Sequence, residues 1–503
     1  MMRPEKASEL GANRSGDMSV TFVYEDRDHE TAIRYVAEEL LLRVGIPFRL
    51  AGYDEATDDA QPVISYGRAL PSPCPPESVP WLHIWEGDFW KGTRGRAYPF
   101  PETPLRTFDD VPALYCGQRS CEKEPGQRPP DAELKCDVVA SAFFLLTRCE
   151  ETASQARDEH DRFPASASFS LKQDILNRPL VDEYAACLFR QLSGIADIPP
   201  RRSPWGRHPY AVCLTHDVDQ IALFRSIRQM LAATRLSLRY KPSAAWRVPR
   251  DFMSCLLGKR SDPFATFEDL VALEKSVGAR GTYFFLSGRG KDAARRYSLS
   301  AVADTIALLQ HAGHEIGLHG SYEAYADALL LEEERERLES ACHTRVVSIR
   351  NHYLRFKLPD TWRAQHDAEL ETDSTLSFAN HEGFRAGTCM PFSSFDAASG
   401  VCLGVTEVPL TIMEGTLYRY RKLRAPRVSA HIDQMTDTIR AVGGAFVLLW
   451  HNSSLYDPLH PQSKQVLRAA MERFAADGAL MIPMKEIAAL WHDHRKELRC
   501  ESS

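Results

Sequence analysis

The chain has 503 residues, of which 44% are hydrophobic and 26% are charged, and its net charge is −7. This length exceeds one typical core, so we expect two domains of roughly 150 to 300 residues. The mild negative charge argues against a nucleic-acid-binding protein. No stretch reaches the ~18 uninterrupted apolar residues of a membrane span, and the polar N-terminus lacks the apolar region of a secretory signal. The expected location is the cytoplasm.

The first part of the chain predicts an α/β domain over residues 18–195, after a disordered tail at residues 1–17. Residues 20–26 (VTFVYED) alternate as a strand does, and helical spacing of apolar residues follows, ending at Gly45. PVISYG predicts another strand, and two helices are expected within ELKCDVVASAFFLLTRCEE and RPLVDEYAACLFRQLSGI. Residues 196–209, rich in proline and arginine, have the composition of a linker. We find no catalytic pattern before this linker.

Short apolar strands alternate with helical segments over residues 210–495. The strands are expected within AVCLTHD, GTYFFLSG, HEIGLHG, VVSIRNHY, FRAGT, VTEVPL, AFVLLWHN and ALMIPM, and helices at 267–277, 302–312, 332–344 and 431–442. This alternation is typical of a parallel sheet buried on both faces. Seven or eight such units favour a barrel, whose active site would lie at the carboxyl ends of the strands.

Polar residues follow four of these strands. Asp217 and Asp219 are only one residue apart, and carboxylates this close repel each other unless a cation or a proton shares them. A lone histidine at a strand end is more often structural, but a barrel brings the strand ends to one mouth, so their repetition indicates a site. The polar residues at these ends are His216, Asp217, Asp219, His314, His319, Glu323, Arg350, His352, Arg355 and His451.

Together these motifs resemble the polysaccharide deacetylase (NodB-homology) family, carbohydrate esterase family four, over roughly residues 210–484. THDVD is similar to the family's first motif, GHEIGLHG to its second, IRNHYLRF to its third and VLLWHN to its last. The N-terminal region resembles the domain that accompanies one bacterial branch of the family, through DEHDRFPASAS and RPLVDEY. The resemblance implies an α/β fold with a distorted (β/α)7-type barrel, preceded by a smaller N-terminal α/β domain.

The resemblance also implies roles for individual residues. They are general base for Asp217, metal ligand for Asp219 and His319, orientation of the base for Arg350, catalytic acid for His451, and a wall for the leaving acyl methyl for Leu449 or Leu448. The implied cofactor is a divalent metal, with Zn²⁺ as the first expectation. Bound Zn²⁺ lowers the pKa of water to about 7, which a hydrolase needs at neutral pH.

The third metal ligand is open, because Glu323 stands where the family's second motif usually has another histidine. Glu323 itself could bind the metal through its carboxylate. Alternatively, His352 could complete an Asp–His–His set, and we favour it because imidazole binds borderline metals well. Loss of metal binding is the third interpretation.

The implied activity is removal of N-acetyl groups from an N-acetylated sugar of a bacterial surface polysaccharide or its precursor. The alternatives are a metal-dependent hydrolase of a non-sugar amide or ester, and a non-catalytic carbohydrate-binding protein with a degenerate site. Arg385 and Trp450 are candidates for substrate contact. Arg385 could equally be a buried arginine paired with Asp373 or Glu407, and an aromatic residue at a strand end is more often part of a core.

An insertion at residues 221–260 carries nine basic residues against one acid, Asp251, in a chain that is acidic overall. Leucine, isoleucine and methionine residues are interleaved with them, as in helices that lie on anionic membrane surfaces. We therefore expect this segment to contact an anionic membrane, or a lipid-linked or acidic glycan. A solvated basic face over the barrel is the alternative.

Overall fold

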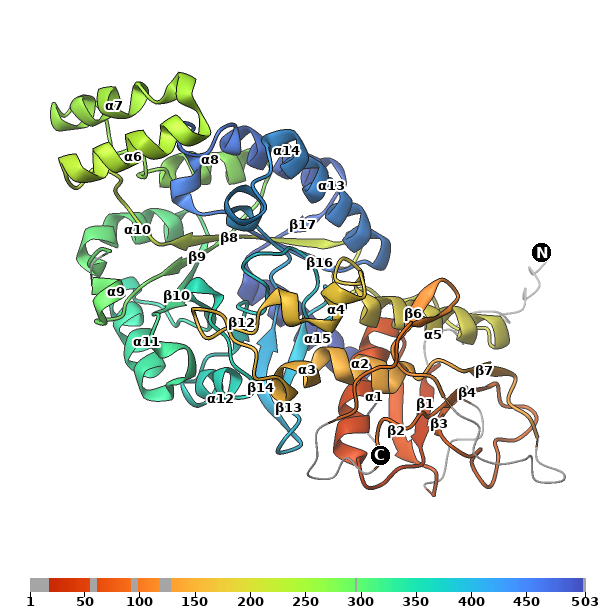
Figure 1. Ribbon diagram of the computed structural model, residues 1–503. Helices are drawn as coiled ribbons and strands as arrows, with labels where there is room; N and C mark the ends of the chain where they lie inside the picture. Colours follow the sequence, from red (N-terminus) through yellow and green to blue (C-terminus); the bar gives the residue numbers. More distant parts are fainter. Residues whose placement is uncertain (1–17, 55–60, 92–97, 118–127, 295, 501–503) are drawn as a thin grey trace, which may run out of the picture.

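The computed structural model of this protein describes residues 18–54, 61–91, 98–117, 128–294 and 296–500. The disordered tail expected at residues 1–17 lies outside the described residues. Two α/β units lie side by side, the N-terminal one red to yellow and the larger C-terminal one green to blue (Figure 1). Among the described residues, no helix is both long enough and apolar enough to cross a membrane.

The N-terminal unit is built on a five-stranded parallel sheet with the strand order β2-β1-β3-β4-β7. Its strands, with the separate hairpin β5–β6, are β1 (Val20–Tyr24), β2 (Phe48–Gly52), β3 (Val63–Gly67), β4 (Trp81–Trp85), β5 (Arg106–Phe108), β6 (Val111–Ala113) and β7 (Ala132–Leu134). Its helices are α1 (Glu30–Val44), α2 (Val138–Leu146), α3 (Cys149–Ala153), α4 (Phe169–Lys172) and α5 (Leu180–Ile195).

Helix α1 ends at Gly45, as its sequence predicts. Gly45 is left-handed, with φ of 73°, and its N–H caps the helix by donating to the Leu41 carbonyl. A Cβ at this position would lie 2.5 Å from the Arg202 carbonyl oxygen, so the close approach of the chain after α5 also requires glycine.

The C-terminal unit is built on a second sheet with the order β13-β14-β12-β11-β10-β9-β8-β16-β15, and β17 also pairs with β8. Its strands are β8 (Ala211–Val218), β9 (Thr282–Phe285), β10 (Glu315–Gly320), β11 (Ser348–Asn351), β12 (Thr372–Asp373), β13 (Phe392–Asp396), β14 (Val401–Glu407), β15 (Ile412–Met413), β16 (Ala445–Leu449) and β17 (Leu480–Met481). All pairings are parallel except β13 with β14.

Helices surround this sheet and project from one end of it (Figure 1). They are α6 (Ile227–Tyr240), α7 (Arg247–Leu256), α8 (Phe267–Ser276), α9 (Lys291–Ala294), α10 (Ala303–His311), α11 (Ala328–Cys342), α12 (Asp360–Asp367), α13 (Ala425–Val442), α14 (Ser463–Ala476) and α15 (Met484–Leu498). The predicted α/β class, with a smaller α/β domain before a larger one, is confirmed. Among the described strands, β13 and β15 end the order and do not pair, so the barrel is open there.

One predicted strand, FRAGT at residues 384–388, is wrong. The segment forms turns, with Gly387 at a φ of 65°. Contacts from the N-terminal unit hold it: Val181 N donates to the Gly387 carbonyl, and Asp182 accepts from Cys389 N at 2.8 Å. Backbone groups engaged in this way are not available to a sheet, and the next strand, β13, begins only at Phe392.

The two units are joined by a continuous core rather than by a free linker. One cluster of buried apolar residues includes Val36 and Phe143 of the N-terminal unit together with Phe392 and Trp491 of the C-terminal unit. Within the predicted linker at residues 196–209, Trp205 is buried and its Nε1 donates to the Gly443 carbonyl at 2.8 Å. Trp205 therefore attaches the predicted linker to the C-terminal unit.

Candidate metal centre

A row of four parallel strands, β8 to β11, brings the predicted site residues together. Strand β10 lies beside β11 with His319 opposite Arg350, and β9 separates β10 from β8, which carries Asp217. The carboxyl ends of parallel strands lie at one edge of a sheet, so Asp219, just after β8, and His352, just after β11, reach the same place as His319.

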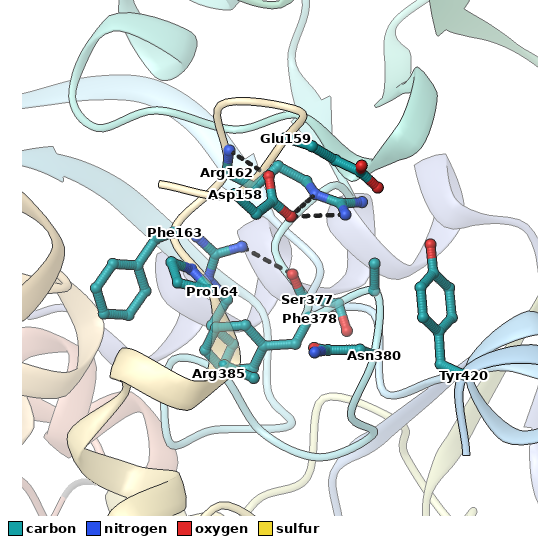
Figure 2. Close-up of a pocket in the computed structure, with 12 residues that line it drawn as sticks. Asp158, Glu159, Arg162, Phe163, Pro164, Ser377, Phe378, Asn380, Arg385 and Tyr420 are labelled. Atoms are coloured by element: carbon teal, nitrogen blue, oxygen red, sulfur yellow. Dashed lines mark hydrogen bonds and ion pairs between the residues drawn. The ribbon is translucent and has the colours of Figure 1, made fainter. Parts of the chain in front are cut away.

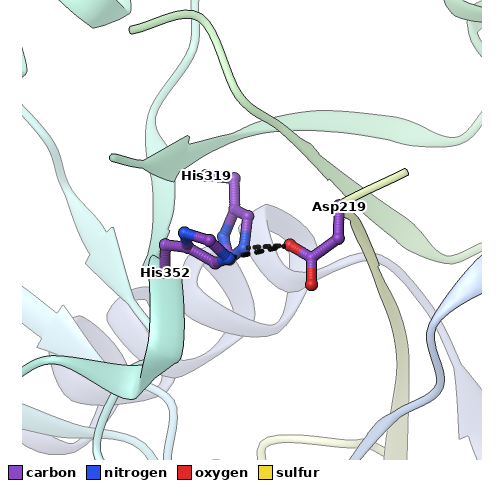
Figure 3. A group of neighbouring side chains, drawn as sticks. All are labelled: Asp219, His319 and His352. Carbon is purple, nitrogen blue, oxygen red and sulfur yellow. Dashed lines mark ion pairs between the residues drawn. The ribbon is translucent and has the colours of Figure 1, made fainter. Parts of the chain in front are cut away.

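The side chains of Asp219, His319 and His352 converge on one point (Figure 3). Asp219 Oδ1 lies 3.3 Å from Nε2 of His319 and 3.2 Å from Nε2 of His352. One potential ligand atom from each residue lies within 4.8 Å of the others. Both histidines are buried.

The other ring nitrogen of each histidine has its own partner. Nδ1 of His319 lies 2.8 Å from the Arg350 carbonyl oxygen, an acceptor, so Nδ1 carries the proton and Nε2 presents a lone pair. Nδ1 of His352 lies at ion-pair distance, 2.8 Å, from Oδ2 of Asp292. Such partners commonly fix the orientation of metal-binding histidines.

The donor set fits a divalent metal. Asp219 Oδ1 is buried and has no hydrogen-bond partner among the described residues, although two imidazole nitrogens face it. Separations of about 3.3 Å are the edges of a tetrahedron with bonds of about 2.0 Å, as zinc makes to nitrogen and oxygen. A set of one carboxylate and two imidazoles also suits a borderline metal.

Glu323 does not belong to this group. Its side chain is exposed on the turn after β10, and an added Cβ on Gly290 would lie 2.7 Å from its carboxylate. The only set of three potential ligands found in the described part of the chain is Asp219, His319 and His352. The structure therefore groups His352, and not Glu323, with Asp219 and His319.

On one side of this group, Asp217 is held by Arg350. The Arg350 guanidinium is fully buried and donates to Asp217 Oδ1 at 3.1 Å and to Thr215 Oγ1 at 2.7 Å. Its remaining N–H groups bind the carbonyl and hydroxyl oxygens of Ser374, both at 2.9 Å. Asp217 Oδ2 is left facing the site, 3.9 Å from Nε2 of His319.

On the other side, His451 pairs with Glu414. His451 Nδ1 lies 2.7 Å from Glu414 Oε1, and its Nε2 lies 3.7 Å from Asp219 Oδ2. Burial would lower the pKa of His451, but Glu414 outweighs it and, with Asp219 and Asp217, raises that pKa to about 9. Burial would raise the pKa of Glu414, but His451 and Ser454 lower it to about 2. The pair is thus a carboxylate holding an imidazolium.

Two substrate-contact candidates lie inside the protein. Trp450 is fully buried in a core cluster and its Nε1 donates to Ser463 Oγ at 3.1 Å, so its ring is part of the core and not exposed for substrate contact. Leu449 and Leu448 are also fully buried, in different core clusters on the two faces of β16. His216, with Nδ1 2.6 Å from the Trp450 carbonyl oxygen, is a structural histidine.

Arg385 is likewise buried and paired. Its Nε and Nη2 donate to Glu151 of the N-terminal unit at 2.9 and 2.5 Å, and Nη1 donates to the Ser377 carbonyl at 2.7 Å. Arg385 is therefore best described as a buried structural arginine. Its acidic partner is Glu151, and not Asp373 or Glu407 as the sequence suggested. Glu151 could not be named from the sequence, because 234 residues separate it from Arg385.

A segment of the N-terminal unit lies beside the metal group. Arg162 Nη1 donates to the Tyr353 carbonyl at 2.6 Å, and the His160 ring lies 4.7 Å from that of Tyr353, the residue after His352. Residues 158–165 also form one wall of a cavity of about 350 Å³ (Figure 2). The rest of its lining comes from residues 377–380, Arg385 and Tyr420.

Sequence reasoning missed two acidic residues of this site. Asp292 lies on the short helix α9, where nothing in the spacing marks it. Glu414 directly follows β15, a strand of two residues, which is too short to show alternation. The available signal was an acid after the apolar pair Ile412–Met413, the same strand-end position that singled out Asp217 and His319.

Comparisons with known proteins cover both units. Residues 21–196 match a family of unknown function, DUF7033. The chain matches no curated protein. Among solved structures, it is similar to a protein from Mycobacterium smegmatis provisionally described as a polysaccharide deacetylase, with 20% identity, a TM-score of 0.38, and coverage of 59% of this chain and 94% of the other.

It is also similar to the peptidoglycan deacetylase PdaC from Bacillus subtilis (11% identity, TM-score 0.29, 57% of this chain and 95% of the other). A third similar structure is a carbohydrate esterase family four pseudoenzyme from Bacillus anthracis (10% identity, TM-score 0.28, 56% and 66%). The family named by these proteins is the one that the sequence motifs resemble. Identities of 20% or less leave the function to be inferred from the residues of this chain.

Proposed function

We propose that this protein is a metal-dependent hydrolase that removes N-acetyl groups from an N-acetylated sugar of a bacterial surface polysaccharide or its precursor. The observation that carries the proposal is the placement of an oriented carboxylate, Asp217, and a protonated imidazole, His451, on either side of the Asp219–His319–His352 group. Amide hydrolysis needs both, because water must lose a proton and an amine leaves well only when it gains one.

A divalent metal held by Asp219, His319 and His352, with Zn²⁺ as our first expectation, would lower the pKa of water to about 7 and polarise the acyl carbonyl. Asp217 accepts the proton of the attacking water at Oδ2, since Oδ1 is bound by Arg350. His451 donates a proton from Nε2 to the leaving nitrogen, since Nδ1 is bound by Glu414. The C–N bond breaks, and acetate and a free amine are the products.

The cavity between residues 158–165 and 377–380 is the proposed place for a neighbouring sugar unit. Arg162, which lines the cavity, donates to the carbonyl of Tyr353, the residue after His352. Asn380 and the half-exposed Tyr420 also line the cavity and offer amide and hydroxyl groups to a sugar (Figure 2). On this proposal the N-terminal unit supplies one wall of the substrate site. Asn380→Ala should then raise KM for oligosaccharides while leaving bound metal unchanged.

The test combines metal analysis of the purified protein with acetate release from N-acetylhexosamine oligomers. We expect one metal ion per wild-type chain, metal lost in His319→Ala, and acetate release lowered by about 100-fold or more in Asp217→Asn. His311→Ala, on an exposed position of α10, is the matched control and should keep both properties. Thermal unfolding of each variant separates loss of metal from loss of fold.

The same measurement separates the alternatives. Release from simple acyl esters or amides, with none from the oligomers, would indicate a non-sugar substrate. Oligomer binding without release of acetate would indicate a carbohydrate-binding protein. A wild-type protein that binds no divalent metal would overturn the proposal. A cytoplasmic location stays a prediction.

A further inference from the structure

The insertion after β8 folds into two helices, α6 and α7, that pack side by side and project from the end of the molecule opposite the N-terminal unit (Figure 1). We call residues 226–260 the hairpin. Its inner side is firmly attached: Ala233 and Val248 are buried in one small cluster with Tyr456 and Leu459. Lys241 Nζ lies 2.7 Å from Asp457 of the same loop.

The outer side of the hairpin exposes large apolar side chains. In α6, Ile227, Leu231 and Leu238 are 63, 50 and 53% exposed, and their spacing of four and seven residues places them on one face. This face lies apart from the buried one, which carries Ala233 and Ser237.

Helix α7, with the residues that flank it, also exposes large apolar side chains. Its buried positions are Val248 and the charged Asp251, which accepts from Tyr456 Oη at 2.9 Å. Trp246, Met253 and Leu257 lie on the opposite side, spaced by seven and four residues, and are 58, 49 and 61% exposed. Large apolar side chains that share one side of a helix and are each about half exposed or more are the kind of surface that marks a contact site.

Basic side chains lie beside the apolar ones. Arg228, Arg235 and Arg239 have the same seven- and four-residue spacing and form the adjacent face of α6. All three are exposed, and in the described part of the chain none has a carboxylate within ion-pair distance. The basic residues that do form ion pairs, such as Lys241 and Arg247, bind Asp457 on the inner side.

We propose that the hairpin docks this protein on the surface of an anionic phospholipid bilayer. A basic face next to an apolar face is what an interfacial helix needs, because arginine contacts lipid phosphates while leucine and tryptophan enter the acyl boundary. A protein partner would need an acidic surface next to an apolar one, placed to fit the basic and apolar faces of the hairpin. An anionic bilayer offers negative phosphates and an apolar interior at every point of its surface. The proposal does not depend on the chemistry of the metal centre.

Co-sedimentation with vesicles tests the proposal, using phosphatidylcholine alone and phosphatidylcholine mixed with phosphatidylglycerol. We expect the wild type to bind only the anionic vesicles, and less as salt rises. The triple variant Arg228→Glu, Arg235→Glu, Arg239→Glu should reduce the partition coefficient by about tenfold or more. The control is Arg207→Glu, Arg345→Glu, Lys496→Glu, which makes the same charge change at exposed positions outside the hairpin and should reduce it far less.

A second variant, Trp246→Ala, Met253→Ser, Leu257→Ser, tests the apolar face and should also lose vesicle binding. Brominated lipids should quench the fluorescence of the wild type, because the exposed indole of Trp246 enters the acyl region. The quenching should be smaller in Trp246→Phe, which lacks this indole. Absence of wild-type binding to anionic vesicles would overturn the proposal, as would equal binding of the hairpin and control variants. A wild-type dimer that dissociates in the apolar variant would also overturn it, by showing that a second copy covers this surface.

Discussion

Glu151 of the N-terminal unit and Arg385 of the C-terminal unit form a two-point ion pair in which neither side chain is accessible to solvent. Arg148 Nε also donates to Glu151, at 2.8 Å. Burial would raise the pKa of Glu151, but Arg385 and Arg148 outweigh it and hold that pKa below its usual range. The two units therefore share charged groups as well as an apolar core.

Removing one partner of this pair leaves the other charge buried without compensation. We expect Glu151→Gln to lower the free energy of unfolding by about 3–5 kcal/mol, measured by urea denaturation. Arg345→Ala is the control, because its pair with Glu371 is more than half exposed and should contribute about 1 kcal/mol or less. Similar losses in the two variants would contradict a stabilising role for the buried pair.

The third metal ligand is tested by comparing His352 with Glu323. His352→Ala should weaken metal binding by about 100-fold or more, because it removes one of three donors. Glu323→Gln should bind metal as the wild type does, since that carboxylate is exposed away from the group. Competition with a chromogenic chelator measures both affinities, and the opposite ranking would assign the ligand to Glu323.

Asp292 should influence the metal through His352. Asp292→Asn keeps the size of the side chain but removes the charge that faces Nδ1 of His352 at 2.8 Å. We expect metal affinity to fall by about 10–100-fold, as is typical when the partner of a ligating histidine is lost. Asp304→Asn on exposed α10 is the matched control. An unchanged affinity in Asp292→Asn would show that the second ring is oriented by packing alone.

Glu414 should keep His451 protonated and fix the orientation of its imidazole ring. Glu414→Gln removes the carboxylate that raises the pKa of His451, so the alkaline limb of the pH–rate profile should move to lower pH. We expect kcat to fall by about 10–100-fold with little change in KM, because the proton is needed in the transition state. A change in KM alone would instead indicate that Glu414 shapes the substrate site.

The N-terminal unit should lose stability as pH rises through the weakly acidic range. Burial raises the pKa of Glu86 to about 7 and that of Asp137 to about 6, although Arg68 and backbone N–H groups act against it. Below about pH 3 both groups are largely protonated in the folded protein and in the unfolded chain. Above pH 7 the folded protein must hold buried charges that the unfolded chain solvates.

The expected loss between pH 4.5 and 7.5 is roughly 1–3 kcal/mol for each group. Glu86→Gln should remove its share of this loss, so thermal melts of the variant should depend less on pH than those of the wild type. Glu77→Gln, at an exposed position, should melt as the wild type does throughout. An equal pH dependence in all three proteins would contradict the assignment to Glu86.

Local patterns in the sequence were sufficient to predict most strands and the strand-end residues. The alternation of β8 placed Asp217 and Asp219 on one side of the chain, and parallel pairing put His319 opposite Arg350. The alternation depends on a period of two, which neighbouring residues encode, whereas the pairing of β10 with β11 is a tertiary contact. The same reasoning failed at FRAGT, where contacts from a distant helix replace a strand.

The sequence by itself determined the α/β class, the two units and the candidate residues Asp217, Asp219, His319, Arg350, His352 and His451, with Glu323 left as the alternative to His352. Only the tertiary structure showed which residues contact these candidates. His352 reaches Asp219 through a turn in which Tyr353 and Leu354 have positive φ, Glu414 approaches His451 from 37 residues away, and Glu151 comes to Arg385 from the other unit. Such contacts depend on long-range packing, which no local period records.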